Sequence, residues 1–369
     1  MDLAVYHPWL KEKGGAEKVV LELAKKSDYN VTIYTLFYDK EKTFEEFKEV
    51  RVEELGSGER PETFIQKAMY GIKSLTAEIP TERYDKLLIS EAGLGSLLTL
   101  RNNDIPIYTY CHTPLRAALP EFKQTYRSEL PIYMKPVFEI GVRAYSLMEK
   151  QAWKKFEHVL ANSETTKERI IAKGLAHQDE ITVLNPGADI DNEPGEYGNY
   201  FFYPSRFRRY KRQDLAIEAF EEAELEDFKL VLAGSAQEEE YIQELREKTE
   251  NNENIEIKTD VPGDQWNQLY KNAYTVLFLA EKEDWGIIPV EAGSYGKPVI
   301  AVNEGGPTES VLQGQTGYLV EADKTAIAEK MKDLASNPEK VREMGEKGLE
   351  NAEKYSWSNF SEKLDEVLR

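Results

Sequence analysis

Cysteine, long hydrophobic runs and metal-ligand patterns are scarce in this sequence, and each absence excludes a class of protein. Cys111 is the one cysteine, so no disulfide can form within the chain, which favours a reducing compartment. No apolar run approaches the about 20 residues of a membrane span. A strand predicted over residues 2–6 argues against a signal peptide, and the histidines lack the spacing of zinc ligands. We therefore expect a cytoplasmic protein without a metal.

Basic residues are outnumbered, with 47 Lys and Arg against 67 Asp and Glu, and the net charge is −20. So acidic a chain would be repelled by phosphate backbones, so no nucleic-acid partner is expected. Hydrophobic residues make up 41% of the chain and charged residues 31%, which is typical of globular proteins. Because 369 residues are more than one core usually fills, we expect two domains.

The most informative stretch is a loop between a predicted strand and a predicted helix. Residues 274–280 are an apolar run typical of a buried strand, and Pro289 suits the first turn of a helix. Gly286 allows a sharp turn or the close approach of a ligand. The N–H groups of Ile287 and Ile288 would then lie at a helix N-terminus, where an anion can bind.

Two carboxylates, Glu283 and Glu291, bracket this loop. An ionised carboxylate only accepts hydrogen bonds, so the pair suits sugar hydroxyls better than phosphate. A second strand, glycine turn and helix start follow over residues 296–300 and 303–309, so both helix N-termini are expected at one edge of a parallel sheet. The alternative is an ordinary turn whose acids favour the helix dipole.

Three further segments carry weaker signals of the same kind. Gly14-Gly15 opens a predicted helix after the first strand, and His112 follows a strand predicted over residues 105–110. Each has a structural alternative, a packing turn or a satisfied histidine. The third segment holds five bases with no acid between Tyr200 and Gln213 and suits a diphosphate, or is simply a solvated loop. Its bases are Arg206, Arg208, Arg209, Lys211 and Arg212.

With these motifs the sequence resembles glycosyltransferase family 4, the retaining nucleotide-sugar transferases with the GT-B fold. Residues 283–291 match its pattern of two glutamates separated by seven residues, and residues 110–116 match a sequence motif of a mannosyltransferase-like branch. The resemblance covers nearly the whole chain. It implies an α/β fold of two Rossmann-like domains facing a cleft, residues 1–186 and 187–355, with helix 356–369 packing back on the first.

The resemblance also implies roles for individual residues. His112 would line the site of the transferred sugar, Arg206 and Lys211 would contact the donor diphosphate, Glu283 would orient the sugar, and Arg116 would lie on the acceptor side. The donor would also be contacted by Gly14, Gly15, Gly234, Val261, Gly286, Ile287, Ile288 and Glu291. The chain departs from the family pattern at Ser205 and Arg212, where glycine is usual or frequent.

The implied activity is transfer of a hexose of mannose or glucose type from a GDP- or UDP-linked donor to a saccharide or lipid-linked glycan, without a cofactor. An epimerase on the same fold or a non-catalytic partner subunit are the alternatives. Residues 116–155 hold eight bases and four acids, +4 in a chain of −20, with interleaved aromatics. This segment suits peripheral contact with an anionic membrane, or is a long amphipathic helix that buries its aromatics.

Overall fold

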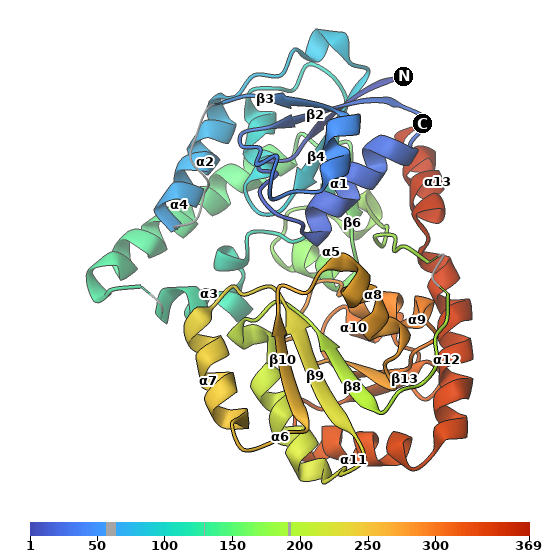
Figure 1. The fold of residues 1–369 in the computed structure, drawn as a ribbon. Coiled ribbons are helices and arrows are strands. Elements are labelled where there is room, and N and C mark those ends of the chain that lie inside the picture. The colour runs from blue at the N-terminus through green and yellow to red at the C-terminus, as the bar shows by residue number, and fades with distance from the viewer. Residues whose placement is uncertain (57–63, 129, 191–192) are drawn as a thin grey trace. The chain divides into compact units, whose positions relative to one another are not determined.

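The computed structural model describes residues 1–56, 64–128, 130–190 and 193–369 (Figure 1). The chain divides into two compact units. Unit 1 consists of residues 1–186 and 357–369, and unit 2 of residues 187–356. Each unit is built on a parallel sheet with helices on both faces.

The sheet of unit 1 has the strand order β3-β2-β1-β4-β5-β6-β7, and all its strand pairs are parallel. Its strands are β1 (Asp2–Tyr6), β2 (Asn30–Thr35), β3 (Arg51–Glu54), β4 (Lys86–Glu91), β5 (Ile107–Cys111), β6 (His158–Ala161) and β7 (Ile181–Val183). Its helices are α1 (Gly15–Lys26), α2 (Phe64–Thr76), α3 (Pro120–Ser128), α4 (Lys135–Trp153), α5 (Glu164–Ala172) and α13 (Trp357–Leu368).

Strand β1 shows why this sheet is buried on both faces. Leu3 and Val5 pack into a cluster that includes residues of α1 and α13, whereas Ala4 and Tyr6 pack into another on the opposite face. Successive side chains of a strand point to opposite faces, so a strand covered by helices on both sides is apolar throughout. The continuous apolar pattern of residues 3–6 is therefore what a central parallel strand requires.

The sheet of unit 2 has the strand order β10-β9-β8-β11-β12-β13 and is likewise parallel. Its strands are β8 (Tyr200–Pro204), β9 (Lys229–Gly234), β10 (Ile255–Thr259), β11 (Thr275–Phe278), β12 (Val299–Val302) and β13 (Gly317–Val320). Its helices are α6 (Gln213–Ala223), α7 (Glu239–Thr249), α8 (Gly263–Lys271), α9 (Ile288–Ser294), α10 (Pro307–Ser310), α11 (Lys324–Ala335) and α12 (Pro338–Ala352).

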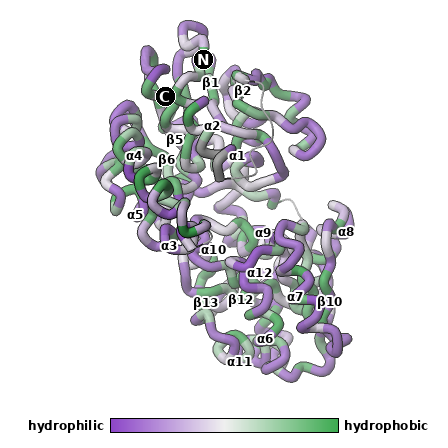
Figure 2. The backbone as a smooth tube through the Cα atoms, turned by 90° about the vertical axis from the view of Figure 1, so that its left-hand side faces the viewer, coloured by the Kyte–Doolittle hydropathy of each residue, from purple (hydrophilic) through white to green (hydrophobic). Residues whose placement is uncertain are grey.

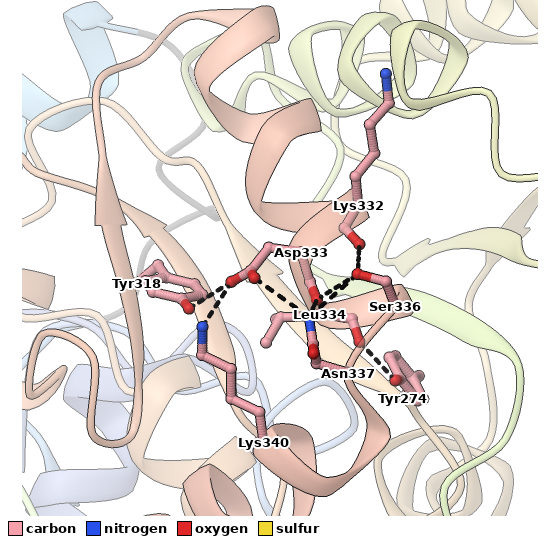
Figure 3. A network of polar contacts seen from close by, with 8 residues as sticks. All are labelled: Tyr274, Tyr318, Lys332, Asp333, Leu334, Ser336, Asn337 and Lys340. Atoms are coloured by element: carbon pink, nitrogen blue, oxygen red, sulfur yellow. Dashed lines mark hydrogen bonds and ion pairs between the residues drawn. The ribbon is translucent and has the colours of Figure 1, made fainter.

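A polar network ties the end of α11 to its neighbours (Figure 3). Asp333 accepts hydrogen bonds from Tyr318 of β13 (2.6 Å) and from Lys340 of α12 (2.8 Å), and these bonds, the one from Lys340 first, lower the pKa of Asp333. The hydroxyl of Tyr274 donates to the carbonyl of Leu334 at 2.7 Å. The network fixes how α11 and α12 meet beside the sheet.

Two features differ from what the sequence indicated. The charged residues before α2 indicated no strand, but they contain β3, a four-residue edge strand that is only partly apolar. Segment 116–155 is not one long helix but two helices, α3 and α4, separated by a turn at Pro131. The pattern of residues 60–76 also predicts a helix; residues 60–63 lie outside the described part of the chain, and residues 64–76 form α2.

The aromatic residues of segment 116–155 are not all buried, contrary to the amphipathic-helix alternative. Phe138 and Tyr145 are buried, but Tyr126 and Tyr133 are 37% and 74% exposed. Hydrophobic and hydrophilic residues alternate along α4 (Figure 2). Within the described part of the chain, no helix combines the length and apolar character that a membrane span needs.

Candidate functional site

Each sheet has a topological switch point, where the order of the strands reverses direction. In unit 1 it lies between β1 and β4, and in unit 2 between β8 and β11. In open α/β sheets ligands bind beyond the carboxyl ends of the strands at such points, because the loops there diverge to opposite faces. Of the segments singled out from the sequence, residues 14–15 follow β1, residues 206–212 follow β8 and residues 283–291 follow β11, whereas His112 follows β5, beside β4.

In unit 2 the two loops at the switch point are joined by an ion pair. The Nζ of Lys211, after β8, lies 2.6 Å from Oε2 of Glu283, after β11. The two side chains are 7% and 19% exposed. The structure therefore brings together a cation and a carboxylate that the sequence had assigned to one donor site, although they are 72 positions apart.

The loop that carries Lys211 is held from its backbone. The hydroxyl of Tyr203, at the end of β8, donates to the carbonyl of Lys211, and the backbone N–H of Leu279 donates to that hydroxyl at 3.1 Å. The side chain of Gln213 donates to the carbonyl of Arg206 at 2.9 Å. Arg206 itself is exposed, so its guanidinium can reach a ligand in solvent.

The loop after β11 requires glycine at position 286. Gly286 has φ +76°, and a Cβ there would lie 2.5 Å from the ring of Phe278, so only glycine fits without strain. Helix α9 begins at Ile288 with Ile287 as its N-cap and Pro289 in the first turn, as predicted. It is a helix of seven residues.

Glu291 points toward the neighbouring helix α8. The hydroxyl of Tyr270 donates to Oε2 of Glu291 at 2.8 Å. Burial, and then the Glu291 carboxylate, raise the pKa of the Tyr270 phenol, so this hydroxyl remains a donor. Tyr270 stacks on Tyr295 with the ring planes 9° apart. Sequence reasoning missed this tyrosine, because nothing local links α8 to α9.

Arg212, one of the two departures from the family pattern, occupies a backbone conformation that favours glycine. Its φ is +55°, in the left-handed region. Its Nη1 lies 3.1 Å from Oε1 of Glu304, in the glycine loop after β12. The backbone N–H of Gly306 donates to the carbonyl of Glu283 at 2.9 Å. These two contacts tie the loops after β8, β11 and β12 together.

Gly234 and Val261 lie at the carboxyl ends of β9 and β10 in the same unit. A Cβ at Gly234 would collide with the backbone carbonyl of Ser205, so close packing alone accounts for the glycine. Val261 is partly buried against the core of unit 2. Their predicted contact with the donor has no further geometric support within this unit.

In unit 1 the glycine pair lies at the start of α1, as predicted. Gly14 is the N-cap and Gly15 the first residue of a 12-residue helix. A Cβ at Gly15 would meet no atom within 4 Å, so its backbone faces open space. At Gly14 a Cβ would meet the flexible end of the Glu17 side chain. Gly15 thus leaves its side of the helix N-terminus accessible to a ligand, whereas the Glu17 carboxylate lies beside Gly14.

His112 follows β5 and is part of a buried polar chain. Its Nε2 lies 2.9 Å from the hydroxyl of Ser90, and the same hydroxyl lies 2.9 Å from Nδ1 of His7. Burial, with His7 nearby as a smaller cause, lowers the pKa of His112 to about 3, and burial lowers that of His7 to about 4. Both imidazoles are therefore neutral at pH 7.

A buried carboxyl follows at the end of β4. Glu91 is 1% exposed and accepts hydrogen bonds from the backbone N–H groups of Gly93 and Ser96. Burial, and then repulsion by Glu149, raise the pKa of Glu91 to about 7. Lys173 forms an ion pair with Glu149 and offsets part of the negative charge of Glu149. The pair of acids is a further feature that the sequence did not reveal.

Arg116 lies in a short turn after β5, near the start of α3. Its guanidinium carbon lies 5.0 Å from the centre of the Phe122 ring, and that of Arg169 lies 5.1 Å from the same ring. Arg169 also pairs with Glu121 at 2.7 Å. Arg116 thus has a packing role, and its predicted contact with the acceptor stays a prediction.

Two families match the chain, one in each half. Residues 13–192 match Glycosyltransferase Family 4, and residues 189–351 match Glycosyl transferases group 1. Together the matches extend over residues 13–351. Among curated proteins, the alpha-1,3/1,6-mannosyltransferase ALG2 of Dictyostelium discoideum is 26% identical, with 100% of this chain and 98% of that protein covered. The enzyme of the same name from Candida glabrata is 27% identical, with 94% and 88% covered.

Solved structures agree on the fold. Anabaena Alr3699/HepE in complex with UDP and glucose has a TM-score of 0.77 at 19% identity, with 100% of this chain and 99% of that chain covered. Sucrose-phosphate synthase from Thermosynechococcus elongatus has a TM-score of 0.81 at 16% identity, with 100% and 98% covered. At these identities the likeness concerns the fold alone, which is the predicted GT-B fold. The chain belongs to glycosyltransferase family 4, and it is a glycosyltransferase.

Proposed function

We propose that this enzyme transfers a hexose of mannose type from a nucleoside diphosphate sugar to a saccharide or lipid-linked glycan, with retention of the anomeric configuration. The observation that carries the proposal is the pair of Lys211 and Glu283 at the switch point of unit 2. A lysine ammonium has three donors, so Lys211 can bind a diphosphate oxygen while it stays bonded to Glu283. Glu283 can in turn accept a hydrogen bond from a sugar hydroxyl.

The chemistry needs a stabilised leaving group. When the bond between the sugar carbon and the donor oxygen breaks, negative charge grows on the departing diphosphate. The acceptor hydroxyl bonds through its oxygen to the same face of the sugar carbon and gives its proton to the departing diphosphate oxygen. A preorganised cation in a partly dry site stabilises such charge more than water does. Lys211 is preorganised by Glu283, and the exposed Arg206 supplies a second positive charge. This account requires no metal, and we propose that transfer is metal-independent.

The mannose type of the donor rests on relatives. The curated relatives named above are mannosyltransferases, and the Anabaena structure contains UDP and glucose. We keep both GDP and UDP as donor nucleotides, with Val261 near the base and Glu291 at the ribose. The names of the curated relatives favour transfer over the epimerase alternative.

The test is a panel of GDP- and UDP-linked mannose, glucose and other hexoses. Release of the nucleoside diphosphate is measured with and without a lipid-linked or free saccharide acceptor, and again with a chelator. Thermal unfolding identifies binding independently, because a ligand at a hundred times its Kd stabilises by about 2.7 kcal/mol. A sugar released or transferred from one donor supports the proposal. A donor converted to its epimer, or binding without turnover on every acceptor, contradicts it.

We also propose that α4 contacts an anionic membrane that carries the acceptor. The exposed apolar side chains before and along α4 are Ile132 (83%), Tyr133 (74%), Val137 (59%), Ile140 (71%) and Leu147 (65%). Bases accompany them, among them exposed Arg143, Lys150 and Lys154. An apolar stripe flanked by bases is typical of a helix that lies in the membrane interface, and each nearby base contributes about 1 kcal/mol at an anionic surface.

Vesicle flotation tests this contact. Binding to vesicles with anionic lipid is expected at low salt, and reversal of three bases to glutamate should abolish it while donor binding persists: Lys150, Lys154 and Lys155. The matched control makes the same charge change at exposed lysines elsewhere: Lys332, Lys347 and Lys363. Absence of binding, or equal loss in both variants, would favour a soluble saccharide as acceptor.

A further inference from the structure

Three polar side chains from adjacent strands form one buried chain in unit 1. His7 follows β1, Ser90 lies in β4 and His112 follows β5, and these strands are neighbours in the order β1-β4-β5. The side chains are 1%, 2% and 9% exposed. The hydroxyl of Ser90 lies 2.9 Å from Nδ1 of His7 and 2.9 Å from Nε2 of His112. One hydroxyl therefore bridges two rings.

The number of protons shared by His7, Ser90 and His112 restricts how their hydrogen bonds can be oriented. A neutral imidazole carries its proton on one nitrogen and accepts with the other, whereas a hydroxyl has a single proton to donate. If both rings donated to Ser90, its own proton would be buried without a partner. If both rings accepted, one contact would hold no proton. Buried polar groups are rarely left unsatisfied, so one ring donates to Ser90 and the other accepts from it.

Each of the two remaining arrangements determines the tautomer of both imidazole rings. When Nδ1 of His7 donates, Ser90 donates to Nε2 of His112, whose own proton is then on Nδ1. When Ser90 donates to Nδ1 of His7, the proton of His7 is on Nε2, and Nε2 of His112 donates to Ser90. The two rings thus carry their protons on the same-named nitrogen, either Nδ1 in both or Nε2 in both.

We propose that His7 and Ser90 are positioning residues that decide whether Nδ1 of His112, the nitrogen not bonded to Ser90, offers a proton or a lone pair to the substrate. The ring is also held by Tyr110, whose ring centre lies 5.0 Å away in an edge-on contact. The inference rests on the proposed function in one respect, the contact of His112 with the transferred sugar. The coupling of the two tautomers does not depend on it.

The coupling is measured directly by nitrogen NMR of the ring atoms in protein labelled at histidine with ¹⁵N. The chain has four histidines, so the signals can be assigned with single variants. At pH 7 we expect His7 and His112 to carry their protons on the same-named nitrogen. In Ser90→Ala the His112 signals should move, and Ser90→Thr, which keeps a hydroxyl, should restore them. Opposite tautomers in the wild type, or unchanged His112 signals in Ser90→Ala, would overturn the proposal.

Kinetics give a second reading with a matched control. Ser90→Ala should lower kcat about 10-fold, as loss of an outer partner does for metal-bound histidines, with little change in the donor KM. Thr109→Val removes another buried hydroxyl of the same sheet, which bonds to the carbonyl of Ile89 at 3.1 Å and to neither histidine. It should leave both kcat and the ring signals unchanged. An equal loss of kcat in the two variants would indicate packing rather than positioning.

The two measurements separate failure of the inference from failure of the function. If the Ser90→Ala variant does not fold, the tautomers of His7 and His112 in the wild-type protein still test the coupling. If the wild-type protein turns over no donor, the proposed function fails while the NMR result stands. If turnover is found and the two rings carry opposite tautomers, the function stands and the positioning role is refuted.

Discussion

The ion pair of Lys211 and Glu283 makes a quantitative prediction for stability and turnover. Lys211→Met and Glu283→Gln each keep side-chain size and remove one charge. Because the side chains are 7% and 19% exposed and 2.6 Å apart, each single change leaves a largely buried charge without its partner. Such a loss costs about 3–5 kcal/mol, and the partial exposure of Glu283 favours the lower end. The double variant has neither charge, so it should lose less than the sum of the single changes.

Turnover should follow the same logic. Each single change should lower the transfer rate roughly 10²-fold, the usual effect of losing one preorganised charge donor. Because both residues act on one leaving group, the double variant should be about as slow as the slower single variant rather than 10⁴-fold slower. Free nucleoside diphosphate should still bind to Glu283→Gln, since Arg206 and the glycine loops remain.

Urea unfolding of the wild type, the two single variants and the double variant measures the coupling energy between the two side chains. Donor turnover by the same proteins measures the transfer rates. The surface pair of Lys248 and Glu218, with side chains 33% and 43% exposed, serves as the control and should show a coupling of about 0–1 kcal/mol. If the unfolding costs of Lys211→Met and Glu283→Gln simply add, the two side chains do not interact in solution. Near wild-type rates in both single variants would refute their assignment to the donor site.

Three further predictions test neighbouring features. Arg206→Ala should lower turnover roughly 10²-fold. Its unfolding midpoint in urea should be unchanged because the side chain is exposed, and a lower midpoint would show a structural role. Gly286→Ala should destabilise by about 1–3 kcal/mol because of its positive φ and the contact with Phe278, which urea unfolding would check. The pKa of Glu91 is raised from 4.5 to about 7, so the stability it contributes is fully present below pH 4.5 and is lost as pH rises through 7. Between pH 5 and 8 the wild type should lose about 2.5 kcal/mol more than Glu91→Gln in urea unfolding, because the loss of 1.36 kcal/mol per pH unit ends near pH 7; equal losses would contradict the raised pKa.

Most of the elements could be predicted from the sequence because their signals are local. Continuous apolar runs such as residues 275–278 identify buried parallel strands, and glycine followed by proline at 286–289 marks the start of a helix. Family resemblance then added the GT-B fold and the roles of the conspicuous side chains. The errors also have local causes: β3 lies at an edge and is only partly apolar, and Pro131 interrupts the helical pattern between α3 and α4.

What the sequence could not supply is the set of partners across the sheets. Glu283 and Lys211, or His7, Ser90 and His112, meet because strands distant in sequence become neighbours in the strand order. The raised pKa of Glu91 likewise depends on burial beside Glu149, a residue of α4. Residue types and spacing determine which strands and helices form, since these depend on neighbouring backbone and side chains. Tertiary packing alone decides which polar atoms lie within hydrogen-bond distance and how far each charge is removed from water.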